Sequence, residues 1–219
     1  MHRLRGIGFG VAFCLAPLLL AAPAAASSQR AKSVEELLTE AEAVFEGRVV
    51  GLEVEDGVTR PIRTCARFQV LEVVKAPPRG LPATVRLCFA GGRGRAGERS
   101  VEGVHVPALG EHGVYFVESL ARPLVNPLLG WDQGRFRILA DPDRPEGFVA
   151  SADGRGVASV DDGRGAPPGL SDGVARGVGL AEAPAATPGA AGLRRGPPAR
   201  PLTPDEFKQR LRALLPATP

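Results

Sequence analysis

The chain has 219 residues, with 27 Lys and Arg, 24 Asp and Glu, 28 Gly and 21 Pro. Such a length suits one domain of roughly 100 to 200 residues plus additional sequence. Removing residues 1–26 takes away Arg3 and Arg5 but no acidic residue, which leaves 25 basic and 24 acidic side chains, a net charge of +1. A nearly neutral chain without a clustered basic stripe argues against nucleic acid as a partner.

Residues 1–26 have the three-part layout of a secretory signal peptide. Two arginines form a basic start, residues 7–20 form an apolar run, and three alanines precede Ser27. Glycine and proline interrupt the apolar run and no basic stop follows it, which argues against a stable membrane anchor after signal removal. We therefore predict cleavage between Ala26 and Ser27 and a periplasmic or secreted mature protein.

A short helix is expected at the start of the mature domain, followed by a long strand. Ser33 and Glu36 form the S-x-x-E pattern of a capping box. Apolar residues then recur at the spacing of one helical face: Val34, Leu37, Leu38 and Ala41. From residue 43 the apolar pattern has period two, and it changes phase near residue 50. This predicts a strand with a bulge or bend at Gly47 and Gly51.

Further strands are predicted at 62–74 and 84–89, each with one apolar and one polar face. Later candidates follow at short spacing: 101–106, 113–117, 135–139, 148–150 and 157–160. Short strands separated by turns that contain Gly and Pro indicate an all-β barrel or sandwich.

Cys65 and Cys88 are the cysteines outside the expected signal peptide. In an antiparallel pair of strands, the residue numbers of opposed positions have a constant sum. Positions 65 and 88 are equally far from the turn at Pro77, so the two cysteines should be neighbours across the hairpin. Export places both residues in an oxidising compartment. We predict a structural disulfide, with free or intermolecular thiols as the alternative; the spacing excludes a redox C-x-x-C motif and a thiolate metal site.

The last part of the chain has two different compositions. Residues 161–200 are mostly Gly, Pro, Ala and Arg, which predicts a disordered linker after a domain at 27–160. Residues 201–219 are expected to form an amphipathic helix, because Thr203 and Glu206 form a second capping box. The apolar stripe of this helix consists of Phe207, Leu211, Leu214 and Leu215.

Residues 92–97 match G-x-G-x-x-G, but a dinucleotide site requires a helix directly after the motif, and only a short polar stretch follows. We interpret the segment as a mobile loop. Its three arginines are candidate contacts for an acidic partner, with a solvated charge run as the alternative: Arg93, Arg95 and Arg99. Trp131 is a second candidate contact, with a core position as the alternative.

The sequence predicts no catalytic residues, no metal site and no cofactor. His105 and His112 have no metal-ligand spacing, and no G-x-S-x-G motif supports a catalytic triad with Ser100 or Ser119.

The region of about 34–150 resembles a group of uncharacterised exported bacterial proteins. The segments that carry the resemblance are 41–49, 68–75, 91–92, 113–117 and 133–136. Their barrel looks like the OB-fold of netrin-type and metalloproteinase-inhibitor domains. The resemblance implies a small OB-like antiparallel barrel. Tissue inhibitors of metalloproteinases act through a mature N-terminal cysteine, and the predicted start at Ser27 departs from that pattern, so their mechanism is not carried over.

The hypothesis that follows is an exported noncatalytic binding module. Its loops at 91–102 and 124–133 would contact an envelope or extracellular protein or a glycan. One alternative is an inhibitor or accessory protein of a secreted protease. Another is a hydrolase that uses one of the two histidines.

Overall fold

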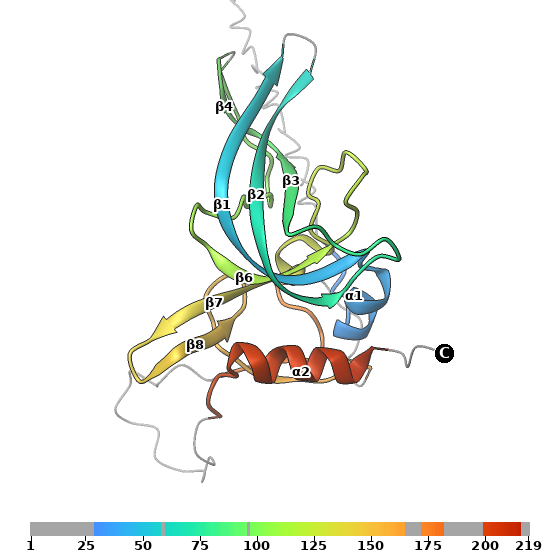
Figure 1. Ribbon diagram of the computed structural model, residues 1–219, viewed down its shortest axis with the longest axis vertical. Coiled ribbons are helices and arrows are strands. Elements are labelled where there is room, and N and C mark those ends of the chain that lie inside the picture. Colours follow the sequence, from blue (N-terminus) through green and yellow to red (C-terminus); the bar gives the residue numbers. More distant parts are fainter. Residues whose placement is uncertain (1–28, 58–59, 96, 165–171, 182–198, 216–219) are drawn as a thin grey trace, which may run out of the picture.

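A six-stranded antiparallel sheet forms the centre of the protein (Figure 1). The structure is a computed structural model that describes residues 29–57, 60–95, 97–164, 172–181 and 199–215. The strand order is β3-β2-β1-β6-β7-β8. The strands are β1 (Ala43–Gly57), β2 (Arg60–Lys75), β3 (Thr84–Ala90), β6 (His112–Val117), β7 (Arg135–Asp141) and β8 (Arg144–Ala150).

Smaller elements surround this sheet. They are α1 (Val34–Glu40), β4 (Gly92–Gly94), β5 (Gly97–Arg99), the 3-10 helix η1 (Trp131–Gly134), β9 (Val157–Val160), β10 (Val178–Leu180) and α2 (Pro204–Leu214). β4 pairs with β5, and β9 pairs with β10. The expectation of a mainly β, antiparallel fold with a short N-terminal and a C-terminal helix is therefore confirmed.

The sheet is not closed into a barrel within the described residues, because β3 and β8 form its two edges. Other segments of the chain take the hydrogen bonds at these edges. Ala90 N in β3 donates to Val125 O at 2.8 Å, and Val149 N in β8 donates to Leu202 O at 2.8 Å. The outer edges are thus partly satisfied without pairing with each other.

The predicted bulge in β1 is confirmed: two of the four register shifts in its pairing with β2 lie at the expected glycines. The register shifts between Glu46 and Gly47 and again between Val49 and Gly51. A Cβ at Gly47 would lie 2.8 Å from the Phe45 ring, so only glycine fits there without displacement. The second of these shifts places the extra residue, Val50, in β1 itself, and it is the one that changes which residues of β1 face the core.

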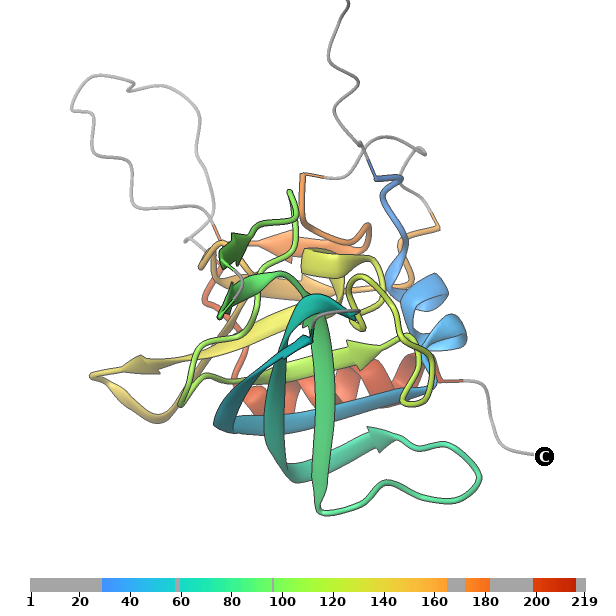
Figure 2. The ribbon, with the colours of Figure 1, turned by 90° about the horizontal axis from the view of Figure 1, so that it is seen from above.

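The sheet separates two hydrophobic cores, which use alternate residues of the same strands. Val44 and Phe116 belong to the first core, and their neighbours Phe45 and Tyr115 belong to the second. The helices α1 and α2 cover the first core, as Figure 2 shows for α2 beneath the sheet. The second core lies among β1, β2, β3 and β6.

Both predicted capping boxes are confirmed. Glu36 N donates to Ser33 Oγ at 3.0 Å, and Ser33 N donates to the Glu36 carboxylate at 2.6 Å. Thr203 and Glu206 repeat this arrangement at the start of α2, with Pro204 at the first helical position. α2 buries Phe207 and Leu211 against the sheet.

The segment 161–200 is not a linker throughout, which corrects the sequence interpretation. Residues 172–181 contain β10, Ala175 is buried, and Arg176 N donates to Lys32 O at 2.8 Å. This segment is held largely by main-chain hydrogen bonds, which do not require the large apolar side chains on which the prediction depended. The rest of that range at 165–171 and 182–198 lies outside the described residues.

The predicted signal peptide and its cleavage site between Ala26 and Ser27 also lie outside the described residues. In the part of the chain that the structure describes, no helix has the length and hydropathy needed to cross a membrane.

Candidate functional site

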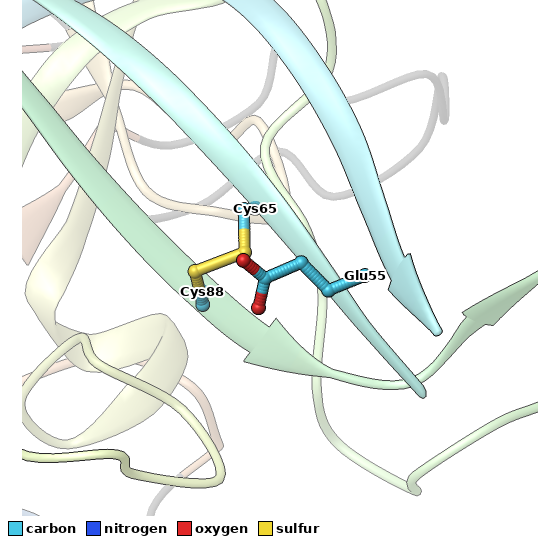
Figure 3. A group of neighbouring side chains, drawn as sticks. All are labelled: Glu55, Cys65 and Cys88. Atoms are coloured by element: carbon cyan, nitrogen blue, oxygen red, sulfur yellow. A yellow bond between two sulfur atoms is a disulfide. The ribbon is translucent and has the colours of Figure 1, made fainter. Parts of the chain in front are cut away.

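Cys65 and Cys88 form a disulfide, as predicted (Figure 3). They are directly opposed in the antiparallel pair of β2 and β3, whose seven paired positions all keep the predicted constant sum of residue numbers. Cys65 is buried, whereas Cys88 is half-buried. The bond therefore fixes the register of these two strands.

The surroundings of the disulfide contain a carboxylate and a guanidinium. Glu55 lies beside the two sulfur atoms, within 4.8 Å of both. Arg86 donates to Glu55 at 2.6 Å and to Cys88 Sγ at 3.2 Å. Because each sulfur is bonded to the other, neither offers a thiolate, and this group does not fit a metal ion in the oxidised protein.

The glycine-rich segment is a short hairpin rather than the mobile loop expected from its composition. β4 and β5 pair antiparallel, and Arg95 N donates to the Asp56 carboxylate on β1. The glycines of the motif here allow the main chains of two short strands to pair. No helix directly follows the motif, as a dinucleotide site would require. Arg93 forms an exposed ion pair with Glu98 at 2.8 Å, and Arg99 is exposed.

Trp131 is half-buried at the start of η1, and a Cβ added at Gly103 would lie 2.9 Å from its ring. Its φ of 56° is an unusual conformation for a residue other than glycine. The Trp131 ring lies beside Gly103, whereas Arg93 is paired with Glu98 within the hairpin. The structure does not gather them into one cluster. Their role in partner binding stays a prediction.

The two histidines each contact a carboxylate. His105 Nδ1 lies 2.8 Å from Asp132, and His112 Nε2 lies 2.8 Å from Glu46. Among the described residues, no serine, threonine or cysteine hydroxyl or thiol makes a hydrogen bond to either ring. Ser119 Oγ instead accepts from the backbone of residues 121 and 122.

A buried ion cluster joins α2 to the sheet, and no sequence pattern predicts it. Lys208 is only 3% exposed and donates to Glu46 on β1 at 2.5 Å and to Glu72 on β2. Burial alone would raise the pKa of Glu46, but hydrogen bonds from His112 and Lys208 lower it below its ordinary value. Hydrogen bonds from Lys208 and Arg212 likewise lower the pKa of Glu72.

A second buried pair lies on the other face of the sheet. Arg135 donates to both oxygens of Glu111, at 2.9 and 2.5 Å, in a bidentate geometry. Tyr115 also donates to Glu111, at 3.2 Å. Burial, reinforced by the Glu111 charge, raises the pKa of Tyr115. The hydroxyl therefore stays protonated at physiological pH.

Exposed apolar side chains lie along one part of β1. β6 pairs with β1 only from Ala43 to Arg48, so residues 50–57, here called the outer half of β1, extend beyond it. In this outer half, Val50, Leu52 and Val54 are 41%, 41% and 44% exposed. Figure 1 shows β4 next to this part of the strand.

Comparisons with family models, with curated proteins and with solved structures find no match to this chain. The resemblance to exported proteins with netrin-type or metalloproteinase-inhibitor domains therefore stays a prediction.

Proposed function

We propose that this is an exported, noncatalytic module that binds another protein through the outer half of β1 and the β4–β5 hairpin. The observation that carries the proposal is the exposed apolar series Val50, Leu52 and Val54, bordered by a basic hairpin. Apolar contact area is typical of protein interfaces, which favours a protein over a glycan.

The hairpin supplies charge next to this apolar series. The Arg95 backbone is fixed to Asp56 at the end of β1, which holds the hairpin close to the apolar side chains. Arg93, Arg95 and Arg99 project from the hairpin and are exposed. An acidic partner with an apolar centre fits this combination, and its association should weaken as salt screens the arginines.

The test uses a photo-crosslinking residue at position 52 in the exported protein. We expect one partner from the envelope or the medium to be captured. Capture should fall at least about tenfold in Val50→Ser/Val54→Ser and in the triple change Arg93→Gln/Arg95→Gln/Arg99→Gln.

The matched control is Leu71→Ser, because Leu71 is equally exposed on β2 but lies away from the outer half of β1. Its capture should equal that of the natural protein. Equal capture by all variants, or capture that does not weaken with salt, would refute the proposed surface.

Two further parts of the proposal concern export and fold type. We propose that the signal peptide is removed between Ala26 and Ser27, and N-terminal sequencing of the exported protein tests this. We also propose that the sheet is an open variant of the OB-like arrangement. The three-stranded meander β1-β2-β3, followed by β6 and β7 on the other side of β1, supports this, since OB-folds are themselves partly open five-stranded barrels.

A further inference from the structure

The outer half of β1 has an open edge on the side away from β2. β6 pairs with β1 only as far as Arg48, and the last main-chain bonds on that side join Val49 to Gly110 and Glu111, at 2.8 and 2.9 Å. Among the described residues, β2 is the only strand that pairs with β1 beyond this point (Figure 1). One edge of the outer half is therefore left without a neighbouring strand.

The hydrogen bonds of β2 show which of its residues face β1. Gly91 N, just after β3, donates to Ile62 O at 2.9 Å. β2 then keeps a regular register with β3 over residues 63–69. Because the direction of the main-chain groups alternates along an antiparallel strand, the even-numbered residues of this part of β2 face β3. The odd-numbered residues, Cys65 among them, face β1.

The same alternation applies to β1. Cys65 lies opposite Glu53, so the N–H and C=O groups of Glu53 point toward β2. The corresponding groups of Leu52 and Val54 therefore point to the open edge, where no other described strand bonds them. The side chains of these two residues are also exposed. An exposed apolar edge with unpaired main-chain donors and acceptors is a template for an added strand.

Other parts of the chain close both ends of this edge. Gly110 lies at one end, where it is hydrogen-bonded to Val49. At the other end, Arg95 N in the β4–β5 hairpin is bound to the Asp56 carboxylate. A strand rises about 3.3 Å per residue, so roughly five residues of an added strand fit between the two ends.

The side chains around the edge define the segment that fits it. Leu52 and Val54 offer apolar contacts on one face, and Glu53 on the other face is paired with Arg67 at 3.3 Å. The exposed arginines of the hairpin favour acidic residues at their end of the edge. A second copy of β1 fits poorly, because opposing Leu52 to Val54 would place the two Glu53 side chains opposite each other.

We propose that the partner protein adds an extended segment of about five residues to this edge as a strand antiparallel to β1. Its apolar residues would lie opposite Leu52 and Val54, and its acidic residues would lie near the hairpin. The inference rests on the proposed protein-binding surface and specifies how the partner binds there. Both present neighbours of β1 are antiparallel to it. In strand addition of this kind, main-chain hydrogen bonds supply affinity and alternate side chains supply specificity.

The first test measures binding of a fluorescein-labelled, C-terminally amidated peptide, Asp-Asp-Thr-Val-Thr-Val-Thr, to the natural protein by fluorescence anisotropy. In the proposed register each valine N–H donates to β1, whereas the N–H groups of the last two threonines point away from it. N-methylation of both valines should weaken binding at least about tenfold. N-methylation of the last two threonines should leave binding unchanged. Replacing both aspartates with asparagine should weaken binding at low salt and have less effect at high salt.

The second test uses partner capture by the photo-crosslinking residue at position 52. Val54→Pro removes the N–H that faces the open edge but keeps an apolar side chain, and strand edges tolerate proline where the N–H faces outward. Capture should fall at least about tenfold, whereas the control Val54→Ala, which keeps the N–H, should lose less than about threefold. Thermal unfolding shows whether Val54→Pro is folded, and the methylated peptides carry the test if it is not.

Absence of saturable peptide binding, or equal binding by the two methylated peptides, would overturn strand addition. So would full capture by a folded Val54→Pro protein. If capture is nevertheless lost in Val50→Ser/Val54→Ser, the proposed surface stands and only the mode of binding is wrong. Conversely, peptide binding that is sensitive to valine methylation, without capture of any partner, would support strand addition and contradict the proposed partner in the envelope or medium.

Discussion

Lys208 places a positive charge at the interface between α2 and the sheet, where its side chain is almost fully buried. In Lys208→Met the buried carboxylate of Glu46 loses its cationic partner. Breaking a buried ion pair by removing one partner is costly, and we expect a loss of about 3 kcal/mol in the free energy of unfolding. Urea denaturation at neutral pH measures it.

The matched control for this change is Glu46→Gln/Lys208→Met, which removes both buried charges. It should recover a substantial part of the loss, because the uncompensated carboxylate is gone. Arg210→Met, at an exposed position of the same helix, should have little effect. A single variant as stable as the natural protein would show that the cluster contributes nothing.

The disulfide gives a second prediction for individual residues. Cys65 and Cys88 are 23 positions apart, and a crosslink over a loop of this size stabilises by about 3 kcal/mol in the chain-entropy model. We expect Cys65→Ser/Cys88→Ser to lose about this much, measured by denaturant unfolding. A reducing agent should destabilise the natural protein and leave the variant unchanged, and equal stability of the two proteins would contradict the prediction.

These two residue pairs show what a sequence can and cannot indicate. The partners Cys65 and Cys88 follow from the arithmetic of one antiparallel hairpin, because a local turn fixes the register. Lys208 and Glu46 are 162 positions apart, and only the packing of α2 onto the first core brings them together.

At the level of elements, α2 depends on the contact of Phe207 with the first core. Phe207 is fully buried, and its ring lies 4.8 Å from that of Phe136. Phe207→Ala leaves a cavity there, and we expect a loss of about 3 kcal/mol or more, measured by thermal and urea unfolding. Gln209→Ala, on the exposed side of α2, should be nearly neutral; equal effects of both changes would mean that the helix does not pack as described.

Elements with strong local signals were predicted well. The capping boxes of α1 and α2 and the irregularities in β1 depend on neighbouring residues, and all are confirmed. The β4–β5 hairpin and β10 were missed because glycine-rich segments have little side-chain patterning. Their main chains are nevertheless hydrogen-bonded to other parts of the sheet and to the N-terminal segment.

For the whole molecule, the lowered carboxylate pKa values predict acid sensitivity. A hydrogen bond from the Ser33 backbone lowers the pKa of Glu36, and hydrogen bonds from Arg30 and Arg176 lower it further. Burial opposes this effect, and the resulting pKa is about 2. The pKa values of Glu46 and Glu72 are also lowered. The stabilisation is therefore present above the unfolded value of about 4.5 and is lost as pH falls toward 2.

The pKa of Lys208 is raised by its carboxylate partners against the opposing effect of burial, so its contribution is lost only in strong alkali. We expect the free energy of unfolding to be flat between pH 6 and 8, as a rough guide, and to fall below pH 4.5. Urea denaturation across this range measures it. Glu36→Gln should reduce the slope at low pH, and a stability that rises on acidification would contradict the assignment.

The closure of the sheet could not be predicted from the sequence, although its β content could. Alternating apolar residues define which strands have a buried face, but they do not specify what occupies the last edge. Here residues 125 and 202, both from irregular segments, take those hydrogen bonds.

The separation of the two cores has a consequence for biosynthesis. All members of the second core lie between Ala43 and Leu128, whereas the first core needs residues from Val34 to Leu211. Domains generally fold from the N-terminal part first, so the second core can form before α2 completes the first core. Until α2 packs onto the sheet, Phe136 lacks its contact with Phe207, and the first core stays exposed to other chains. Docking of α2 is thus the step that completes the first core.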